Sequence, residues 1–336
     1  MHLLNGIMFN YRINWSFLLT LLSCSLVTIF IYRYVTGEVL VPYKLRIFFS
    51  KNSNRVRSAN SRISTNRSNN ASNYHLISPS LHPNKWTKLM FLSKMTLAPN
   101  TSLYKFKLKH RNEKLNIPTS HYVAVRVILN GKEEIRNYTP IHTNENVGCL
   151  DLIVKTYTLG NVSKYFTTLK PGDYLEFKGP MGEFVYEDVQ TTQLGLIAGG
   201  SGITPILEVL NEYMSNPDKL EKVCLIYANE TVHDILLKEE LDSMMSKYPQ
   251  FHVYYVLHYP PSKHDMTLCD EETWSGGIGY ITKRDMEQYL PEYADDHRLL
   301  ICGPPEMTNM VLNYARSLGW NSGFQKSKGD QKVFVF

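Results

Sequence analysis

Three short motifs hold the residues of this chain whose types and spacing are best suited to chemistry. They are the pentapeptide Arg136–Pro140 (RNYTP), the glycine-rich run Gly199–Pro205 (GGSGITP) and the tetrapeptide Cys302–Pro305 (CGPP). The first offers a guanidinium fork, an aromatic ring and a hydroxyl group. The second offers backbone amides that can approach a pyrophosphate, and the third offers a thiol after an apolar run. Each is weak evidence alone, but their order indicates a flavin site, a dinucleotide-phosphate site and a nicotinamide site.

The elements that must position these motifs change in type along the chain. Short β-rich runs separated by Gly, Pro and Asn begin after Trp86, which is typical of a small antiparallel barrel. From Gly195 strands and helices alternate, which predicts a parallel sheet covered by helices. The expected barrel strands are Met90–Leu97, Ser102–Leu108, Tyr122–Leu129, Asp151–Tyr157 and Tyr174–Lys178. The second part should contain strands at Leu194–Ala198, Val223–Ala228, Phe251–Leu257 and Leu299–Cys302, and helices at Pro205–Met214, Lys238–Tyr248, Met286 onward and Thr308–Leu318.

The motifs and the stretches between them resemble the NADH-cytochrome b5 reductase family, within the ferredoxin-reductase-like flavoproteins. The resemblance covers roughly Trp86 to Phe336, and its last residues are most similar to the fungal membrane-bound members. It implies an antiparallel FAD-binding β-barrel followed by a parallel-sheet NAD(P)-binding domain. Supporting stretches are Asp151–Tyr157, Gly160–Ser163, Ala228–Thr231, Asp234–Leu237, Lys326–Asp330 and Val333–Phe336.

From its residues alone, the pentapeptide could be an exposed strand end with a structural arginine. The resemblance implies instead that it binds FAD and that Thr139 lies at the reactive flavin nitrogen as a catalytic residue. Asn137 stands where many members carry proline, so the loop lacks that source of rigidity. The FAD contacts implied here are Arg136, Asn137, Tyr138, Thr139 and Pro140.

A second FAD-binding segment is expected at the end of the strand that follows. Lys155 and Tyr157 alternate with apolar residues, so both should lie on one face, which could simply be the solvent face. Ser163 is a candidate N-cap for a short helix, Lys164–Leu169, whose free amides can bind phosphate. Family members often carry lysine where Asn161 stands, so one positive charge is missing here. The contacts implied by the resemblance are Val154, Lys155, Tyr157, Gly160, Asn161, Val162 and Ser163.

The two later motifs could be a tight strand-to-helix turn and a buried cysteine followed by turn-forming prolines. The resemblance implies an NAD(P)H site, with Thr204 also reaching the flavin and Phe336 shielding it. Cys302 would then be a catalytic residue that assists hydride transfer without acting as a covalent nucleophile. The NAD(P)H contacts implied are Gly199, Gly200, Ser201, Gly202, Thr204, Pro205, His258, Cys302, Gly303 and Pro304.

His258 bears on the choice of nucleotide. Strict NADH users of the family place an aspartate there, which repels the 2′-phosphate of NADPH. Without that repulsion we expect NADPH to be a usable donor beside NADH, although a loop histidine that points into solvent is an equal interpretation.

Composition and charge exclude other classes of function. Net charge is +5, but the first 75 residues carry +8, so the remainder carries −3 and nucleic-acid binding by the folded part is not expected. Five scattered cysteines without a C-x-x-C pair predict neither a disulfide framework nor a zinc site. No metal is expected, and no histidine, aspartate or glutamate is assigned a catalytic role.

The amino-terminal quarter predicts a membrane anchor. Residues 15–34 are apolar and acid-free, long enough to cross a bilayer, and follow a short tail, 1–14. A cleaved signal peptide and a buried core helix are the alternatives, but no small-residue cleavage site or polar stripe is present. Residues 35–83 form a basic linker rich in Ser and Asn. The basic residues behind the span predict a cytosolic catalytic part, most simply at the endoplasmic reticulum, with the mitochondrial outer membrane or plasma membrane as alternatives.

The expected organisation places the FAD-binding barrel at 84–187 and the NAD(P)-binding domain at 188–336. By resemblance, the acceptor is cytochrome b5 or a similar haem protein, which Lys155, Lys164 and Lys178 would attract. Reduction of a quinone or another membrane acceptor is an alternative within enzymes. A flavin-binding scaffold or sensor with vestigial activity is an alternative outside them. We expect a monomer.

Overall fold

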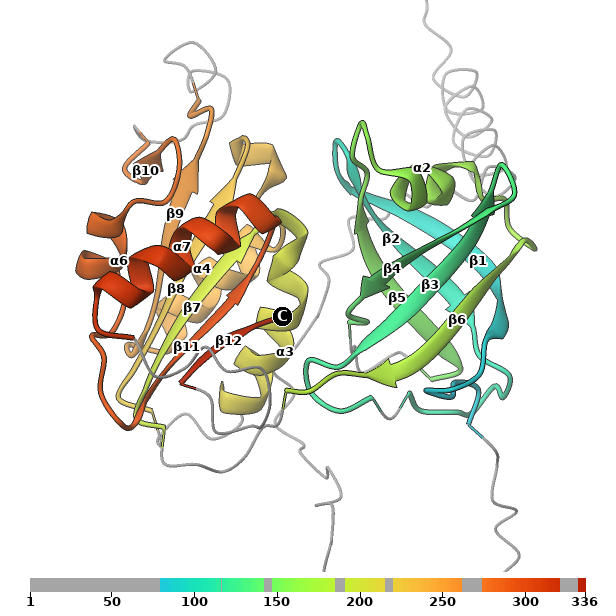
Figure 1. The fold of residues 1–336 in the computed structure, drawn as a ribbon, viewed down its shortest axis with the longest axis horizontal. Coiled ribbons are helices and arrows are strands. Elements are labelled where there is room, and N and C mark those ends of the chain that lie inside the picture. The colour runs from blue at the N-terminus through green and yellow to red at the C-terminus, as the bar shows by residue number, and fades with distance from the viewer. Residues whose placement is uncertain are drawn as a thin grey trace, which may run out of the picture.

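The computed structural model describes residues 79–115, 117–141, 147–184, 191–214, 220–261, 274–320 and 332–336. The predicted tail, membrane span and nearly all of the linker lie outside the described residues. Within the described ranges, no helix combines the length and apolar character needed to cross a bilayer. Two units stand side by side, a curled antiparallel sheet and a parallel sheet flanked by helices (Figure 1).

The first unit is the expected antiparallel barrel. Its six strands run in the order β4-β3-β6-β1-β2-β5, and each neighbouring pair is antiparallel. The two outer strands of this order, β4 and β5, contact each other, and the amide of Ile141 donates to the carbonyl of Asp151 at 3.1 Å. The strands are β1 (Thr87–Ala98), β2 (Thr101–Lys107), β3 (Tyr122–Leu129), β4 (Lys132–Tyr138), β5 (Cys149–Lys155) and β6 (Tyr174–Met181), and helix α2 spans Asn161–Thr168.

Alternation of side chains explains why this sheet curls around a core. On β3, Val123, Val125 and Val127 are buried, whereas Arg126 points outward and pairs with Glu133 and Glu176. Four aromatic rings fill the interior with tilted or edge-on contacts at centroid distances of 4.8–6.2 Å. They are Phe91, Tyr104, Phe106 and Phe177, and Phe166 of α2 closes the end of the barrel above them.

Two details at the edges of this unit differ from the sequence-based expectation. Helix α2 begins at Asn161 with Gly160 as its N-cap, so Ser163 is not the cap and instead donates to the carbonyl of Gly160 at 3.2 Å. Ser80 and Leu81 are buried, and the amide of Gly179 donates to the carbonyl of His82. Barrel packing therefore begins inside the segment predicted as linker.

The second unit is the expected parallel sheet, with strands in the order β10-β9-β8-β7-β11-β12. The strands are β7 (Gln193–Gly199), β8 (Lys222–Asn229), β9 (Phe251–Leu257), β10 (Gly277–Ile278), β11 (His297–Cys302) and β12 (Val333–Val335). The helices are α3 (Ile203–Met214), α4 (Lys238–Lys247), α6 (Lys283–Tyr289) and α7 (Pro305–Ser317), with 3₁₀ turns at Gly200–Gly202 and Val232–Asp234.

Both faces of the sheet are covered, which explains why its central strands are apolar between their polar end residues. Leu196 packs in the cluster formed with α3 and α4, whereas the next residue, Ile197, packs in the cluster formed with α6 and α7. The carboxyl ends of β7 and β11 lie side by side, because Ala198 pairs with Cys302. This register brings the glycine-rich and cysteine motifs to the same edge of the sheet.

The two units share one apolar interface. Ala98, Leu103 and Ile153 of the barrel belong to the same buried cluster as the residues of α3. The hydroxyl of Ser120 crosses between the units and donates to the carbonyl of Pro205 at 2.9 Å. The strand β12 was not predicted from the sequence. It places the carboxyl terminus on the side of the parallel sheet that faces the barrel (Figure 1).

Candidate functional site

The end of β4 presents the pentapeptide to the surface. The side chain of Arg136 is 58% exposed, with one guanidinium nitrogen donating to the carbonyl of Ile135 at 2.7 Å and lying 3.7 Å from Glu134. Tyr138 packs edge-on against Phe166 at 5.4 Å, and burial raises the pKa of its phenol, so the hydroxyl stays protonated. Thr139 is half-buried and Pro140 is buried. The pentapeptide thus offers an exposed cation and a fixed aromatic ring.

The end of β5 and the start of α2 form the neighbouring wall. Val154 and Val162 are buried in the barrel core, so these two predicted contacts could reach a ligand only through their backbone atoms. Ser163 accepts from the amide of Tyr157 at 3.2 Å and fixes the connecting loop. Asn161 is exposed and donates to Glu134 at 3.3 Å, which places the start of α2 beside β4.

Lys155 is not on a solvent face, because its side chain is only 6% exposed. Its ammonium lies 3.4 Å from Asp234 and 3.6 Å from Glu230, both in the second unit. The expectation that Lys155 helps to attract a partner protein is therefore wrong. The residue instead links the two units beside the glycine-rich loop.

The glycine-rich loop follows β7 and becomes the start of α3. Gly200 has a φ of +52°, a conformation that favours glycine, and a Cβ placed there would meet only the Lys155 side chain, at 3.8–3.9 Å. Its carbonyl accepts from the hydroxyl of Tyr227 at 3.1 Å. Thr204 donates to the carbonyl of Ser201 at 3.1 Å. Gly200 is thus an open point at a helix start, suited to a phosphate.

The cysteine motif packs directly against this loop. A Cβ on Gly202 would lie 2.5 Å from the carbonyl oxygen of Cys302, and one on Gly199 would lie 2.9 Å from Pro304. Gly303 is equally confined by Met307. The glycines at 199, 202 and 303 therefore allow close packing between the two loops, whereas Gly200 leaves space in front of the loop.

Cys302 lies at the end of β11, and burial raises the pKa of its thiol to about 12. The group is therefore protonated near neutral pH. A neutral thiol is a poor nucleophile, which agrees with a role that forms no covalent bond.

The carboxyl terminus lies in an aromatic cluster between the units. The rings of Phe184, Phe334 and Phe336 lie 4.9–5.2 Å apart. The amide of Phe336 donates to the carbonyl of Ile301 at 3.0 Å, next to Cys302. Pairing of β12 with β11 therefore brings the last residue to the cysteine motif.

His258 lies one residue beyond β9, at the same carboxyl edge. The centroid of its ring lies 4.3 Å from that of Tyr259 and 4.8 Å from that of Tyr280, and both tyrosines are largely exposed. Its Nδ1 atom is buried without a hydrogen-bond partner. The residue is thus half-buried in an aromatic corner, and the interpretation as a histidine pointing freely into solvent is wrong.

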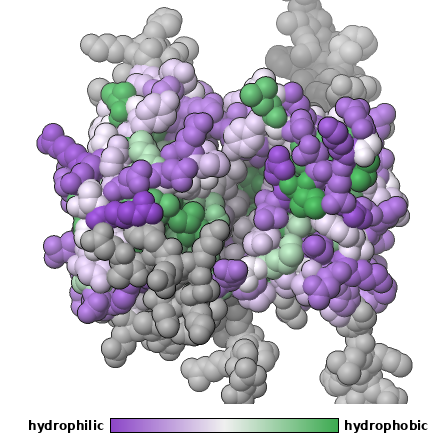
Figure 2. All heavy atoms as spheres, in the orientation of Figure 1, coloured by the Kyte–Doolittle hydropathy of each residue, from purple (hydrophilic) through white to green (hydrophobic). Residues whose placement is uncertain are grey.

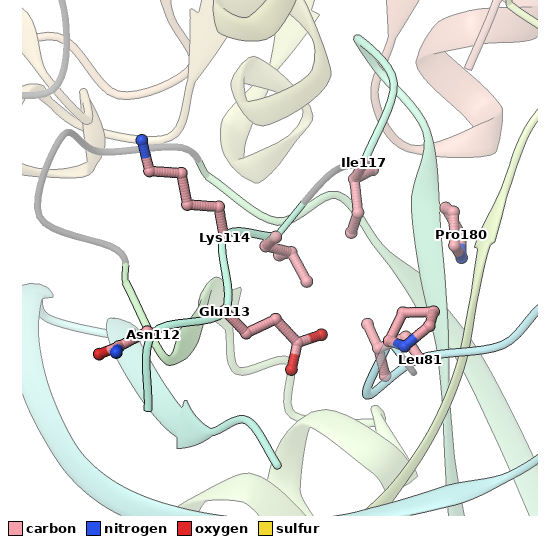
Figure 3. A pocket seen from close by; sticks show the side chains of 8 residues that line it. Leu81, Asn112, Glu113, Lys114, Ile117 and Pro180 are labelled. Atoms are coloured by element: carbon pink, nitrogen blue, oxygen red, sulfur yellow. The ribbon is translucent and has the colours of Figure 1, made fainter. Parts of the chain in front are cut away.

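Among the described residues, two of the cavities lie on the barrel. One, of about 310 Å³, borders the site because Tyr157 and Lys164 line it. The other, of about 340 Å³, is formed where residues 79–81 enter the barrel and shares no residue with the predicted site. Figure 3 shows the carboxyl group of Glu113 pointing into it beside Leu81, while Lys114 points away. That carboxylate accepts from the amide of Ser80 at 2.7 Å, so a structural hydrogen bond already uses it.

The residues fit the two nucleotides that the sequence predicts. An exposed guanidinium, a buried ammonium and the amino-terminal end of α3 are the donors that pyrophosphates require. The described residues contain no cluster of His, Cys, Asp or Glu suited to a metal ion.

Sequence reasoning missed the residues that hold this edge together. Tyr227 is fully buried, and its hydroxyl joins the carbonyl of Gly200 to the amide of Leu236 at 3.1 and 3.3 Å. Asp234 and Glu230 contact Lys155 across the interface. The spacing Thr231-x-x-Asp234 is a recognisable capping pattern, but nothing in the sequence shows that it meets the barrel.

The two units match two known domain families. Residues 88–186 match the oxidoreductase FAD-binding domain, and residues 196–313 match the oxidoreductase NAD-binding domain. The fold is similar to the solved structure of the cytochrome b5 reductase domain of Ulva prolifera nitrate reductase, with a TM-score of 0.64 and 29% sequence identity. That likeness covers 77% of this chain and all of the other.

Curated relatives cover most of both chains. The plasma membrane-associated coenzyme Q6 reductase PGA3 of Saccharomyces cerevisiae is 48% identical over 90% of this chain and 89% of its own. NADH-cytochrome b5 reductase 1 of Debaryomyces hansenii is 38% identical over 77% of this chain and 88% of its own. The chain therefore belongs to the NADH-cytochrome b5 reductase family of FAD- and NAD-dependent oxidoreductases.

Proposed function

We propose that this protein is a membrane-anchored reductase that takes electrons from NAD(P)H and passes them through FAD to cytochrome b5 or a similar haem protein. The observation that carries the proposal is the meeting of the motifs at one interface. The glycine-rich loop contacts β5 of the barrel on one side and the cysteine motif on the other. The dinucleotide and the flavin would therefore bind next to each other.

Bound FAD supplies the chemistry that connects a two-electron donor with one-electron acceptors. The protein would contribute binding, orientation and exclusion of water. Arg136 would hold the flavin pyrophosphate, and Thr139 would face the reactive edge of the ring with its hydroxyl and amide. The start of α3 would hold the dinucleotide phosphates, Cys302 would line the nicotinamide site as a neutral thiol, and Phe336 would cover the flavin from the side of β12.

The surface around α2 supports a haem-protein acceptor. Lys164 is exposed on α2, and Leu159, in the loop that precedes this helix, is 92% exposed. Lys178 lies over the ring of Trp86 at 5.0 Å and is only partly exposed. The visible faces of both units are mainly hydrophilic, with small apolar patches on each of them (Figure 2). An exposed lysine near an exposed apolar side chain suits a transient partner with an acidic face.

A quinone is a second candidate acceptor. One observation favours it, since the relative that aligns over 90% of this chain bears the name of a coenzyme Q6 reductase. The same relative is named as plasma membrane-associated, which supports an anchor and makes the plasma membrane a candidate location beside the endoplasmic reticulum.

Parallel rate measurements distinguish the acceptors. The full chain, purified in mild detergent, would receive NADH together with either cytochrome b5 or a short-chain ubiquinone. We expect faster reduction of cytochrome b5, with a rate that falls as salt rises because charge attraction is screened. If the quinone is reduced faster and its rate does not depend on salt, the acceptor is the quinone and not the haem protein.

The anchor is tested separately from the chemistry. The full chain should resist carbonate extraction from membranes, because residues 15–34 are apolar and long enough to span. Protease added to sealed cytosolic-side-out vesicles should remove the catalytic part. Protection of that part would show that the proposed orientation is wrong.

A further inference from the structure

Lys155 sits between two carboxylates that come from the other unit. Its side chain is 6% exposed, and its ammonium lies 3.4 Å from Asp234 Oδ1 and 3.6 Å from Glu230 Oε1. Both separations are longer than a well-made charged hydrogen bond, which is about 2.7–2.9 Å. The ammonium is therefore shared loosely by two anions in a buried place, where a pair must be well made to offset the desolvation of its charges.

The ammonium also faces the open point of the glycine-rich loop. A Cβ placed on Gly200 would lie 3.9 Å from Lys155 Nζ, with no other atom nearer than 3.8 Å. An anion approaching Gly200 and the start of α3 would thus meet Lys155. Tyr227 ties Gly200 to Leu236, two residues after Asp234, so the loop and the aspartate belong to one braced unit.

The two carboxylates differ in how firmly they are held. Asp234 is 8% exposed, and its Oδ2 accepts from the amide of Thr231 at 3.1 Å and from the Thr231 hydroxyl at 2.7 Å. Its other oxygen is left to face Lys155. Glu230 is 58% exposed and contacts Lys155 only at 3.6 Å. One partner is fixed, whereas the other can leave at little cost.

We propose that Asp234 is the positioning residue that holds Lys155 toward the dinucleotide phosphates, and that Glu230 is the displaceable partner whose place those phosphates take. The inference deepens the proposed function and rests on it. On this proposal Glu230 competes with the dinucleotide for Lys155, whereas Asp234 favours dinucleotide binding. The two effects are opposite although both side chains are carboxylates that contact Lys155. Simple repulsion between anions would make both residues unfavourable for binding.

The dissociation constant of NAD⁺, measured by calorimetry on the FAD-loaded full chain, tests this difference in sign. Asp234→Asn should weaken NAD⁺ binding about tenfold, because Lys155 loses the carboxylate that orients it. Glu230→Gln should tighten binding about threefold, because the competitor is gone. Tighter NAD⁺ binding in both variants would mean that the two carboxylates act only by repelling the dinucleotide, and this would overturn the proposal. Weaker binding or no change in Glu230→Gln would also overturn it.

Two further variants separate positioning from folding. Thr231→Ala removes the hydroxyl contact to Asp234 but keeps the backbone amide contact and the contact between Asp234 and Lys155, so binding should change much less than in Asp234→Asn. In a Lys155→Met background the effects of Asp234→Asn and Glu230→Gln should both disappear, and their persistence would contradict a role through Lys155. A further outcome is that the unaltered protein holds FAD whose absorbance NADH bleaches while the variants do not change NAD⁺ affinity in the expected directions. That result would contradict the roles of Asp234 and Glu230 but not the proposed function.

Discussion

Arg136 and Lys155 are cations that the barrel brings to the candidate site, and their surroundings are opposite. The Arg136 side chain is 58% exposed and has one 3.7 Å contact with a carboxylate of its own strand. Lys155 is 6% exposed and lies between two carboxylates of the other unit. One cation is open to a ligand, whereas the other is already engaged across the interface.

The difference shows that the candidate site has two halves. We call the exposed surroundings of Arg136 the open half, and Lys155 with the packed glycine-rich and cysteine loops the locked half. On the open half, a ligand gains a contact without displacing one, so a substitution should affect ligand affinity more than stability. On the locked half, the loops and charges depend on each other, so a substitution should affect both. The following predictions test that division.

The largest effect is expected in the locked half, from Gly202→Ala. The new Cβ would lie 2.5 Å from the carbonyl oxygen of Cys302, so the two loops must separate. We expect a loss of about 3 kcal/mol in unfolding free energy together with weak NAD⁺ binding. Gly200→Ala is the matched control, since that Cβ has space and only the positive φ opposes it, at about 1 kcal/mol. Equal effects in thermal denaturation would mean that the loops are not locked.

Arg136→Ala tests the open half. It should weaken FAD binding by about 1.5–3 kcal/mol, the value of a charge-assisted hydrogen bond, while the thermal midpoint of the flavin-free protein stays the same. Arg126→Ala is the control, because that arginine pairs with Glu133 and Glu176 on the barrel surface. It should leave flavin affinity unchanged. A flavin titration in which Arg136→Ala matches the unaltered protein would remove Arg136 from the site.

His258→Asp tests whether His258, in the second unit, determines the preference between NADH and NADPH. A carboxylate in this half-buried corner should repel the 2′-phosphate of NADPH, raising the NADH-to-NADPH ratio of kcat/KM about tenfold. Steady-state reduction of ferricyanide measures the ratio. His252→Asp places the same charge on an exposed residue near the start of β9 and should leave it unchanged. An unaltered ratio in His258→Asp would show that His258 does not read the 2′ position.

The smallest effect concerns the pH dependence of Cys302. Burial raises the pKa of this thiol from 9.0 to about 12, so it is protonated in both the folded and the unfolded chain below about pH 9. Its contribution to stability is fully present there and is lost as pH rises from about 9 toward 12. Flavin reduction by NADH should therefore have the same pH profile below about pH 9 in the unaltered protein and in Cys302→Ala, with a modestly lower rate. An added ionisation in the unaltered protein alone would imply a reactive thiolate.

Much of the fold could be predicted because its signals are local. Alternation on β3 and the apolar runs of β7, β8 and β9 fix two kinds of sheet, and the glycine-rich run fixes the start of α3. The family resemblance rests on the same local motifs, and the matched domains confirm it.

The missed features depend on contacts between distant segments. Lys155 has the pattern of a solvent-facing lysine, and only the docking of the second unit buries it against Asp234. The three residues of β12 are too short to predict, and they form a strand because β11 offers an unpaired edge. The sequence predicts the start of α2 three residues late, because Gly160, which has no capping side chain, precedes the helix.

Absorption spectroscopy of the purified full chain tests the central claim most directly, namely that the three motifs form one site for FAD and NAD(P)H. The account predicts a yellow protein with about one FAD per chain, bleached without oxygen by added NADH and reoxidised by ferricyanide. A folded protein that is colourless, or a yellow one that NADH does not bleach, would contradict it.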